Sequence, residues 1–165
     1  MLKKFVSSIL AIALLAGCGG KSDGGKTDNE TAGVACAQIA ADLVDQLDLG
    51  DVVTEAKARI VYGSFFNARE GDEDCPVTDA AAYLPTDKNS DTIGVFRTDD
   101  AETVVSMLND YLSAQKALSE MYSPEEVFKI SNAIVETSKD GKIVILAVCN
   151  DIEDAKKKIS AVLGK

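Results

Sequence analysis

Apolar residues recur at the spacing of a helix face in five stretches of the chain, and each stretch predicts a helix. The expected helices cover residues 34–49, 51–66 and 99–122, a short segment that begins at Ser123, and residues 152–163. Asp99 and Glu102 have capping-box spacing, so the long helix is expected to begin at Asp99 or Asp100. Its apolar face is interrupted only by Gln115.

Two later helix starts also carry N-cap residues. Ser123 precedes Pro124, which suits the first helical position, and Glu126 would complete a second capping box. Asp151 stands in the same place before the final helix. These caps predict that the chain begins a new helix at each of the two positions.

Four stretches predict strands, over residues 77–84, 92–97, 133–137 and 142–149. Asp140-Gly141 supplies the positive φ angles of a tight hairpin between the last two. The run 143–148 is apolar without alternation, which favours a central strand covered on both faces, although one helical layer could suffice. The order α-α-β-β-α-α-β-β-α predicts an α+β fold, a two-layer sandwich with helices on one face of a four-stranded, mainly antiparallel sheet.

The N-terminus has the plan of a signal peptide, with basic residues up to Lys4 and an apolar run from Phe5 to Ala16. The run is shorter than the roughly 20 apolar residues that a helix needs to cross the bilayer core. Leu15-Ala16-Gly17-Cys18 resembles the bacterial lipobox. The resemblance implies cleavage between Gly17 and Cys18 and a diacylglycerol on the Cys18 thiol. We therefore expect a lipid anchor on the extracytoplasmic face of the cell membrane.

Three segments follow from this plan. Residues 1–17 are the predicted lipoprotein signal peptide, and residues 18–33 the lipidated cysteine and a flexible tether, because this stretch lacks the apolar side chains that could offset its ordering entropy. Residues 34–165 form one globular domain. That domain holds 13 Lys and Arg against 24 Asp and Glu, a net charge of −11, which excludes nucleic acid as a partner.

Histidine is absent, which removes the commonest general base and the commonest metal ligand. No Ser/His/Asp arrangement can exist, and neither a GxxxxGK[ST] nor a GxGxxG phosphate loop is found. Ser113-Ala114-Gln115-Lys116 matches the SxxK nucleophile motif in letters only, since no SDN or KTG sequence accompanies it. We expect no catalytic residue, no cofactor and no enzymatic activity.

Three cysteines remain besides Cys18, namely Cys36, Cys75 and Cys149, and no two form a CxxC pair. An oxidising compartment would allow one disulfide among them, and the sequence does not choose among the three pairings. Cys36 and Cys149 fall on predicted core faces, where a reduced cysteine behaves as a small hydrophobe. Cys75 precedes Pro76 in an acidic loop, whose carboxylates disfavour a reactive thiolate.

Two acidic loops are candidate cation sites. Asp72-Glu73-Asp74 is a carboxylate cluster, and residues 87–91 have the alternating oxygen spacing with which calcium loops begin. The second loop has Thr92 and Thr98 where an EF-hand needs Gly and Glu, so it lacks two required positions. We interpret both as solvated turns and expect no metal site.

Several segments together resemble the domain of unknown function 4358 family. They are the lipobox, Tyr62-Gly63, the strand 91–97, the long helix that leads into residues 122–126, and the closing strand and helix. The resemblance covers roughly Cys36 to Leu163, and the acidic loop 69–76 departs from it. It implies a small lipoprotein and lends neither an activity nor catalytic residues.

Three functions are compatible with these observations. The first is a non-catalytic, lipid-anchored domain that recognises an unidentified protein or other component of the cell envelope. The second is a module that binds a small ligand or a cation. The third is a hydrolase with paired carboxylates, for which residues such as Asp99 and Glu136 would have to converge in a cleft. The lack of any catalytic constellation favours the first.

Overall fold

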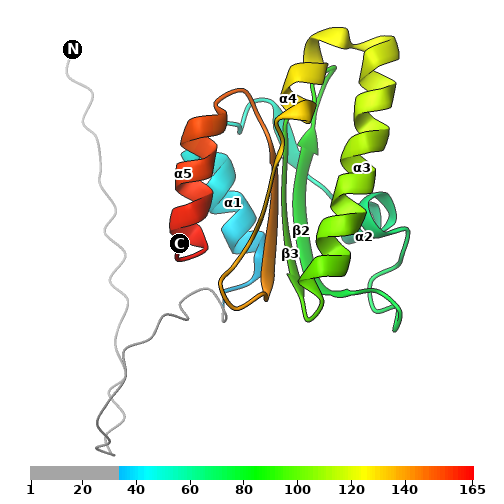
Figure 1. Cartoon of the computed structure of the whole chain (residues 1–165), viewed down its shortest axis with the longest axis vertical. Coiled ribbons are helices and arrows are strands. Elements are labelled where there is room, and N and C mark those ends of the chain that lie inside the picture. Colours follow the sequence, from blue (N-terminus) through cyan, green and yellow to red (C-terminus); the bar gives the residue numbers. More distant parts are fainter. Residues whose placement is uncertain (1–33) are drawn as a thin grey trace, which may run out of the picture.

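A five-stranded sheet forms the middle layer of the computed structural model, which describes residues 34–165 (Figure 1). The strands lie in the order β1-β2-β3-β5-β4, and each neighbouring pair is antiparallel. They are β1 (Val53–Glu55), β2 (Val77–Pro85), β3 (Thr92–Thr98), β4 (Ile134–Thr137) and β5 (Ile143–Val148). The predicted α+β class is confirmed. The predicted strand number is wrong by one, because β1 is a three-residue edge strand within a stretch whose pattern predicts only a helix.

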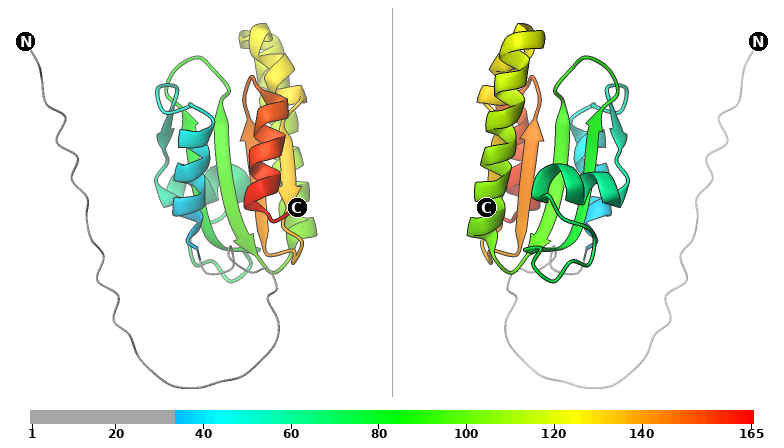
Figure 2. Two further views of the ribbon diagram at one scale, coloured as in Figure 1. Left: turned by 90° about the vertical axis from the view of Figure 1, so that its left-hand side faces the viewer. Right: turned by 90° about the vertical axis from the view of Figure 1, so that its right-hand side faces the viewer.

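Helices cover both faces of the sheet (Figure 2). They are α1 (Cys36–Gln46), α2 (Ala58–Phe66), α3 (Ala101–Tyr122), α4 (Val127–Ser131) and α5 (Ile152–Val162), with a 3-10 turn, η2 (Pro124–Glu126), between α3 and α4. One face carries α1 and α5, and the other carries α2 and α3. The prediction of helices on one face only is therefore wrong, and the protein has three layers.

The central strands explain this three-layer arrangement. All six residues of β5 are buried, and successive side chains of a strand point to opposite faces. Ile143, Ile145 and Ala147 accordingly join the core beneath α1 and α5. Val144, Leu146 and Val148 join the core beneath α2 and α3. A run without alternation thus needs a helical layer on each side.

The helix caps agree with the sequence in part. Asp151 accepts a hydrogen bond from the Asp154 N–H at 3.1 Å, as predicted. The long helix is capped by Asp100, which accepts from the Thr103 N–H at 3.1 Å, and Asp99 lies outside the cap. The second predicted capping box is wrong: Ser123 makes no side-chain cap, and the Glu126 carboxylate reaches another part of the fold.

Gly94 in β3 allows the close packing of an aromatic cluster, and we expect Gly94→Ala to be destabilising. A Cβ there would lie 2.6 Å from Phe96 Cζ, and the fully buried Phe96 ring is held by edge contacts to Phe65 and Phe66, at centroid distances of 5.3 and 5.0 Å. Overpacking of this kind lowers the free energy of unfolding by about 1–3 kcal/mol. Urea unfolding measures this change, with Gly63→Ala as the control.

Gly63 lies in α2, and a methyl group added to its Cα would have no neighbouring atom within 4 Å. Alanine at position 63 should therefore raise the free energy of unfolding by about 0.5–1 kcal/mol, because alanine has the higher helix propensity. Gly94→Ala should lower the free energy of unfolding and Gly63→Ala should raise it. Equal effects would contradict the proposed crowding between Gly94 and Phe96.

No helix within residues 34–165 is long and apolar enough to cross a membrane. The predicted signal peptide, the cleavage site at Gly17 and Cys18, and the tether lie outside the described residues.

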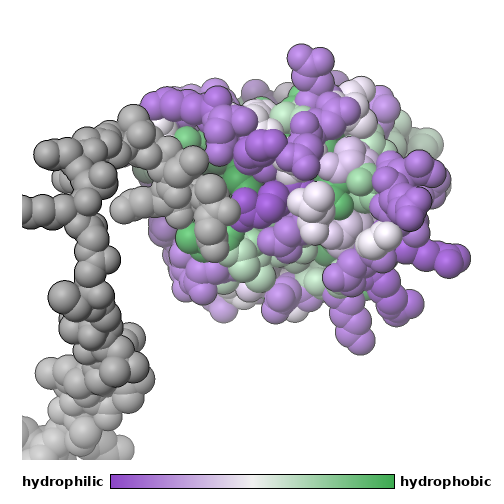
Figure 3. Space-filling view, turned by 90° about the horizontal axis from the view of Figure 1, so that it is seen from below, coloured by the Kyte–Doolittle hydropathy of each residue, from purple (hydrophilic) through white to green (hydrophobic). Residues whose placement is uncertain are grey.

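The first described residues lie at the end of the sheet where β3 finishes. The Cys36 N–H donates to Asp79 Oδ2 at 3.0 Å, and Asp79 pairs with Arg97. Seen from this end, hydrophilic side chains predominate (Figure 3).

Candidate functional site

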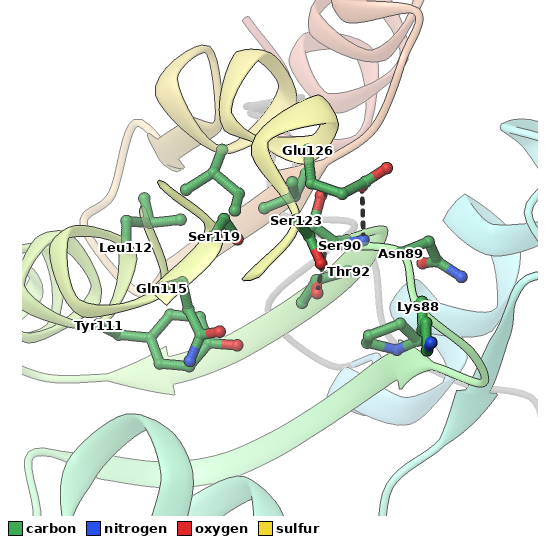
Figure 4. A pocket seen from close by; sticks show the side chains of 13 residues that line it. Lys88, Asn89, Ser90, Thr92, Tyr111, Leu112, Gln115, Ser119, Ser123 and Glu126 are labelled. Atoms are coloured by element: carbon green, nitrogen blue, oxygen red, sulfur yellow. Dashed lines mark hydrogen bonds between the residues drawn. The ribbon is translucent and has the colours of Figure 1, made fainter. Parts of the chain in front are cut away.

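A pocket of about 140 Å³ lies at the opposite end of the sheet, where β3 begins (Figure 4). It is enclosed by the turn between β2 and β3, the C-terminal half of α3, and the η2–α4 segment. Its polar lining consists of Lys88, Asn89, Ser90, Thr92, Tyr111, Gln115, Ser119, Ser123 and Glu126. The apolar lining is supplied by Pro85, Leu112, Ile130 and Val148.

The α3 wall follows from helical spacing. Gln115 and Ser119 are four residues apart and therefore share one face, and Ser123 continues that row just beyond the helix. All three are half-buried. Gln115 is the residue that interrupts the predicted apolar stripe. The interruption thus corresponds to the pocket rather than to an exposed part of the helix.

The turn between β2 and β3 is held against η2 by Glu126. Its Oε2 atom accepts hydrogen bonds from the Ser90 N–H at 2.8 Å and from the Ser90 hydroxyl at 2.6 Å. The Thr92 hydroxyl donates to the Ser90 carbonyl at 3.1 Å, and the Asp91 N–H donates to Asn89 Oδ1 at 2.9 Å. These bonds give the turn a fixed shape at the mouth of the pocket.

A buried ion cluster braces this wall. Lys129 Nζ lies 2.9 Å from Asp91 Oδ2 and 2.6 Å from Glu126 Oε2. The Lys129 and Asp91 side chains are 7% and 6% exposed, and that of Glu126 is 13% exposed. Among residues 34–165, Asp91 Oδ1 is the one buried side-chain oxygen or nitrogen without a hydrogen-bond partner. Buried charges are stable only when paired, so this cluster ties α4 to the start of β3.

The contacts within the cluster shift the pKa values of Glu126 and Lys129 in opposite directions. Burial raises the pKa of Glu126, but hydrogen bonds from Lys129 and Ser90 outweigh burial and leave the pKa below its usual value of 4.5. Burial lowers the pKa of Lys129, and its bonds to Glu126 and Asp91 reverse this, so the pKa lies above 10.5. Both groups are therefore charged across the physiological range.

Comparison with known proteins identifies the segment that builds this site. A family model described as a domain of unknown function, DUF4358, matches residues 73–149. This segment belongs to the DUF4358 family. No curated protein and no solved structure matches the chain.

The DUF4358 match is shorter than the predicted extent of Cys36 to Leu163, since α1, β1, α2 and α5 lie outside it. It nevertheless contains every residue that lines the pocket and all three members of the ion cluster. The candidate site is thus a feature of the DUF4358 segment itself.

The three cysteines of the domain are not bonded to one another. Cys36, Cys75 and Cys149 are free thiols, so within residues 34–165 none of the three possible disulfides is formed. Cys36 lies where β3 ends and Cys149 follows β5 at the other end of the sheet, roughly 20 Å away by strand geometry, whereas a disulfide needs Cα atoms within about 7 Å. Cys75 packs in the other core, across the sheet.

The two buried thiols are unreactive. Burial raises the pKa of Cys36 to about 12, and the adjacent Asp79 adds to the shift. Burial also raises the pKa of Cys149, with a smaller contribution from Asp91. Neither residue forms a thiolate at neutral pH, so both act as small core side chains.

The remaining sequence candidates lie away from the DUF4358 pocket. Asp99 pairs with Lys142 at 2.5 Å, and Glu136 pairs with Lys165, so each carboxylate of the suggested hydrolase pair has a different lysine partner. The Ser113 hydroxyl donates to the Asn109 carbonyl at 2.8 Å on an exposed face of α3. No group of three or more potential ligands in residues 34–165, the Asp72-Glu73-Asp74 loop included, could hold a metal ion.

Sequence reasoning misses the ion cluster because its members are far apart in the chain. Asp91 and Lys129 are 38 residues apart, and the local pattern around Glu126 predicts a helix cap. Two local signals are present: Gln115 within an apolar stripe, which lines the pocket, and Asp91 just before a buried strand, which belongs to the ion cluster. Neither signal specifies a partner, because the partner lies on another element.

Proposed function

We propose that this chain is a lipid-anchored, extracytoplasmic protein whose DUF4358 domain binds a small polar ligand without catalysis. The observation that supports this proposal best is the pocket, whose hydroxyl and amide side chains come from separate elements held by a buried ion cluster. A volume of about 140 Å³ is close to the cavity of roughly 150 Å³ known to accept a benzene ring. We expect a ligand of roughly four to ten non-hydrogen atoms.

The position of the pocket suits a tethered domain. Residues 34–36 lie at the end of the sheet where β3 finishes (Figure 1), and the pocket lies at the other end, where β3 begins. A lipid on Cys18 would hold the first of these ends nearer the membrane. The pocket would then face away from the attachment point and be open to ligands in the envelope.

The side chains in the pocket favour binding over chemistry. Glu126 is the one carboxylate in the lining, and its lowered pKa makes it a weak general base. The chain holds no histidine that could activate Ser119 or Ser123. Hydroxyls without a base serve to orient a ligand by hydrogen bonds.

Filling the pocket tests the proposal. Ser119→Phe should abolish binding of small polar metabolites, because the new ring would occupy the pocket, whereas Ser113→Phe places the same ring on an exposed face of the same helix. Ligand-observed NMR on the full chain in detergent, with a defined mixture of polyols, amines and amino acids, is the measurement. A compound that binds both variants equally, or no binder at all, would contradict the proposed function.

Recognition of an envelope protein is the second candidate, favoured by exposed apolar side chains beside the pocket. Leu118, Met121, Tyr122 and Phe128 are 49%, 66%, 79% and 66% exposed. Leu118 lies one helical turn from both Met121 and Tyr122, so these three share one face of α3. Crosslinking in native membranes, with Tyr122→Ala as the comparison, would identify a partner held by this surface.

A further inference from the structure

The ion cluster beside the pocket carries more negative than positive charge. Asp91 and Glu126 contribute two carboxylates and Lys129 one ammonium group, so the cluster has a net charge of −1 with side chains no more than 13% exposed. Lys129 is the one buried cation within residues 34–165. Lys129 does not line the pocket, and Lys88, the one cation of the pocket lining, is exposed. A buried net charge of −1 is stabilised by a further positive partner.

Two carboxylate oxygens of the cluster lack a donor. Asp91 Oδ1 is buried without a partner; Asp91 itself is not among the residues that line the pocket, whereas its neighbours Ser90 and Thr92 are. Every side-chain contact of Glu126 involves Oε2, so its Oε1 atom accepts no hydrogen bond from any residue between 34 and 165. Glu126 itself forms part of the pocket wall. An acceptor that bears charge and borders a cavity is complementary to a charged donor.

We propose that the pocket binds a ligand through a primary ammonium group, with Glu126 as its counter-ion. This inference rests on the proposed binding function and specifies the ligand class. An ammonium group has three donors and no acceptor, so one N–H can bond to Glu126 Oε1 while the others meet neighbouring lining acceptors such as the hydroxyls of Ser119 and Ser123. The domain charge of −11 favours the approach of cations, and Glu126 repels a carboxylate in the same position.

Four probes of similar size separate the possibilities on the unaltered full chain in detergent. Ethanolamine carries an ammonium group, ethylene glycol is its neutral counterpart, glycolate is an anion, and tetramethylammonium is a cation without donors. Titrations followed by NMR should show ethanolamine binding at least tenfold more tightly than each of the others, the minimum expected of a charge-assisted hydrogen bond. Potassium and magnesium chloride, added alone, should not compete at equal ionic strength.

A pair of adjacent glutamates provides the matched variants. Glu126→Gln keeps the side-chain size and the acceptor for Ser90, and it makes the cluster neutral, so the fold should persist while ethanolamine affinity falls at least tenfold. Glu125→Gln removes an exposed carboxylate one residue away and should leave the affinity unchanged. If Glu126→Gln does not fold, the probe series on the unaltered chain still decides the question.

The outcomes distinguish the ligand class from the binding function. Tighter binding of ethylene glycol, glycolate, tetramethylammonium or a metal ion alone, or undiminished affinity in a folded Glu126→Gln chain, would overturn the ammonium assignment. If such binding is still lost in Ser119→Phe, the proposed function stands. If no probe or metabolite binds in a manner that Ser119→Phe abolishes, both fail.

Discussion

Replacing Lys129 with methionine should lower the free energy of unfolding by about 3–5 kcal/mol. Methionine occupies a similar volume, but it leaves Asp91 and Glu126 buried without their counter-ion. Removal of one partner from a buried ion pair is costly because the remaining charge cannot be solvated. For a domain of this length the loss corresponds to about 10–15 °C in Tm, measured by circular dichroism.

The matched control is Lys142→Met. Lys142 pairs with Asp99 at the surface, where the two side chains are 49% and 81% exposed. Water screens such a pair, so this variant should unfold at nearly the temperature of the unaltered chain. The deficit of Lys129→Met should also shrink as the pH falls towards the lowered pKa of Glu126, because protonation of that carboxylate removes the charge that Lys129 stabilises in the unaltered chain. A Lys129→Met chain as stable as Lys142→Met would show that the cluster does not brace the fold.

Cys18→Ser is expected to abolish lipidation and normal processing of the chain. The hydroxyl of serine cannot take the place of the thiol to which the diacylglycerol would be attached. At roughly 0.8 kcal/mol per buried methylene, two or more acyl chains hold a protein firmly at a bilayer. The acidic domain, at −11, adds no electrostatic attraction to an anionic membrane. Attachment should therefore depend on the lipid alone.

Fractionation of cells that express the Cys18→Ser chain provides the measurement, together with metabolic labelling by a fatty acid. Wild-type chain should be labelled and sediment with membranes. Any mutant domain that is nevertheless released from its signal peptide should be unlabelled and soluble. Gly19→Ser, which changes the next residue and leaves the thiol in place, should behave as the wild type. A processed mutant domain that still sediments with membranes would reveal a second contact.

Comparison of β5 and β1 shows how far the sequence can be interpreted. The apolar run of β5 indicates burial on both faces, and the structure places one helical layer on each side of it. Periodicity reports how buried a residue is and leaves open what covers it. β1 cannot be predicted from periodicity because three residues are too few for a periodic signal. These residues form a strand only because they pair with the end of β2.

The candidate site is still less accessible to sequence reasoning. Gln115 and Asp91 stand out as polar residues in apolar surroundings, which is a local signal. The pairing of Asp91 with Lys129 arises only when α4 folds back over the start of β3, across 38 residues of chain. Nothing in the local pattern around Lys129 distinguishes it from a solvated lysine. Its burial is a property of the assembled layers.

Local sequence was enough to specify the α+β class, the antiparallel hairpin at Asp140-Gly141, the Asp151 cap and the absence of histidine chemistry, although in the hairpin only Gly141 has a positive φ, of 71°. These features depend on side chains within one turn or one strand of each other, where local sterics and hydrogen bonds decide the conformation. The three layers, the free thiols, the buried ions and the pocket emerge only in the assembled fold. Each of these requires groups that are distant in the chain to meet, and their meeting is decided by the packing of whole elements.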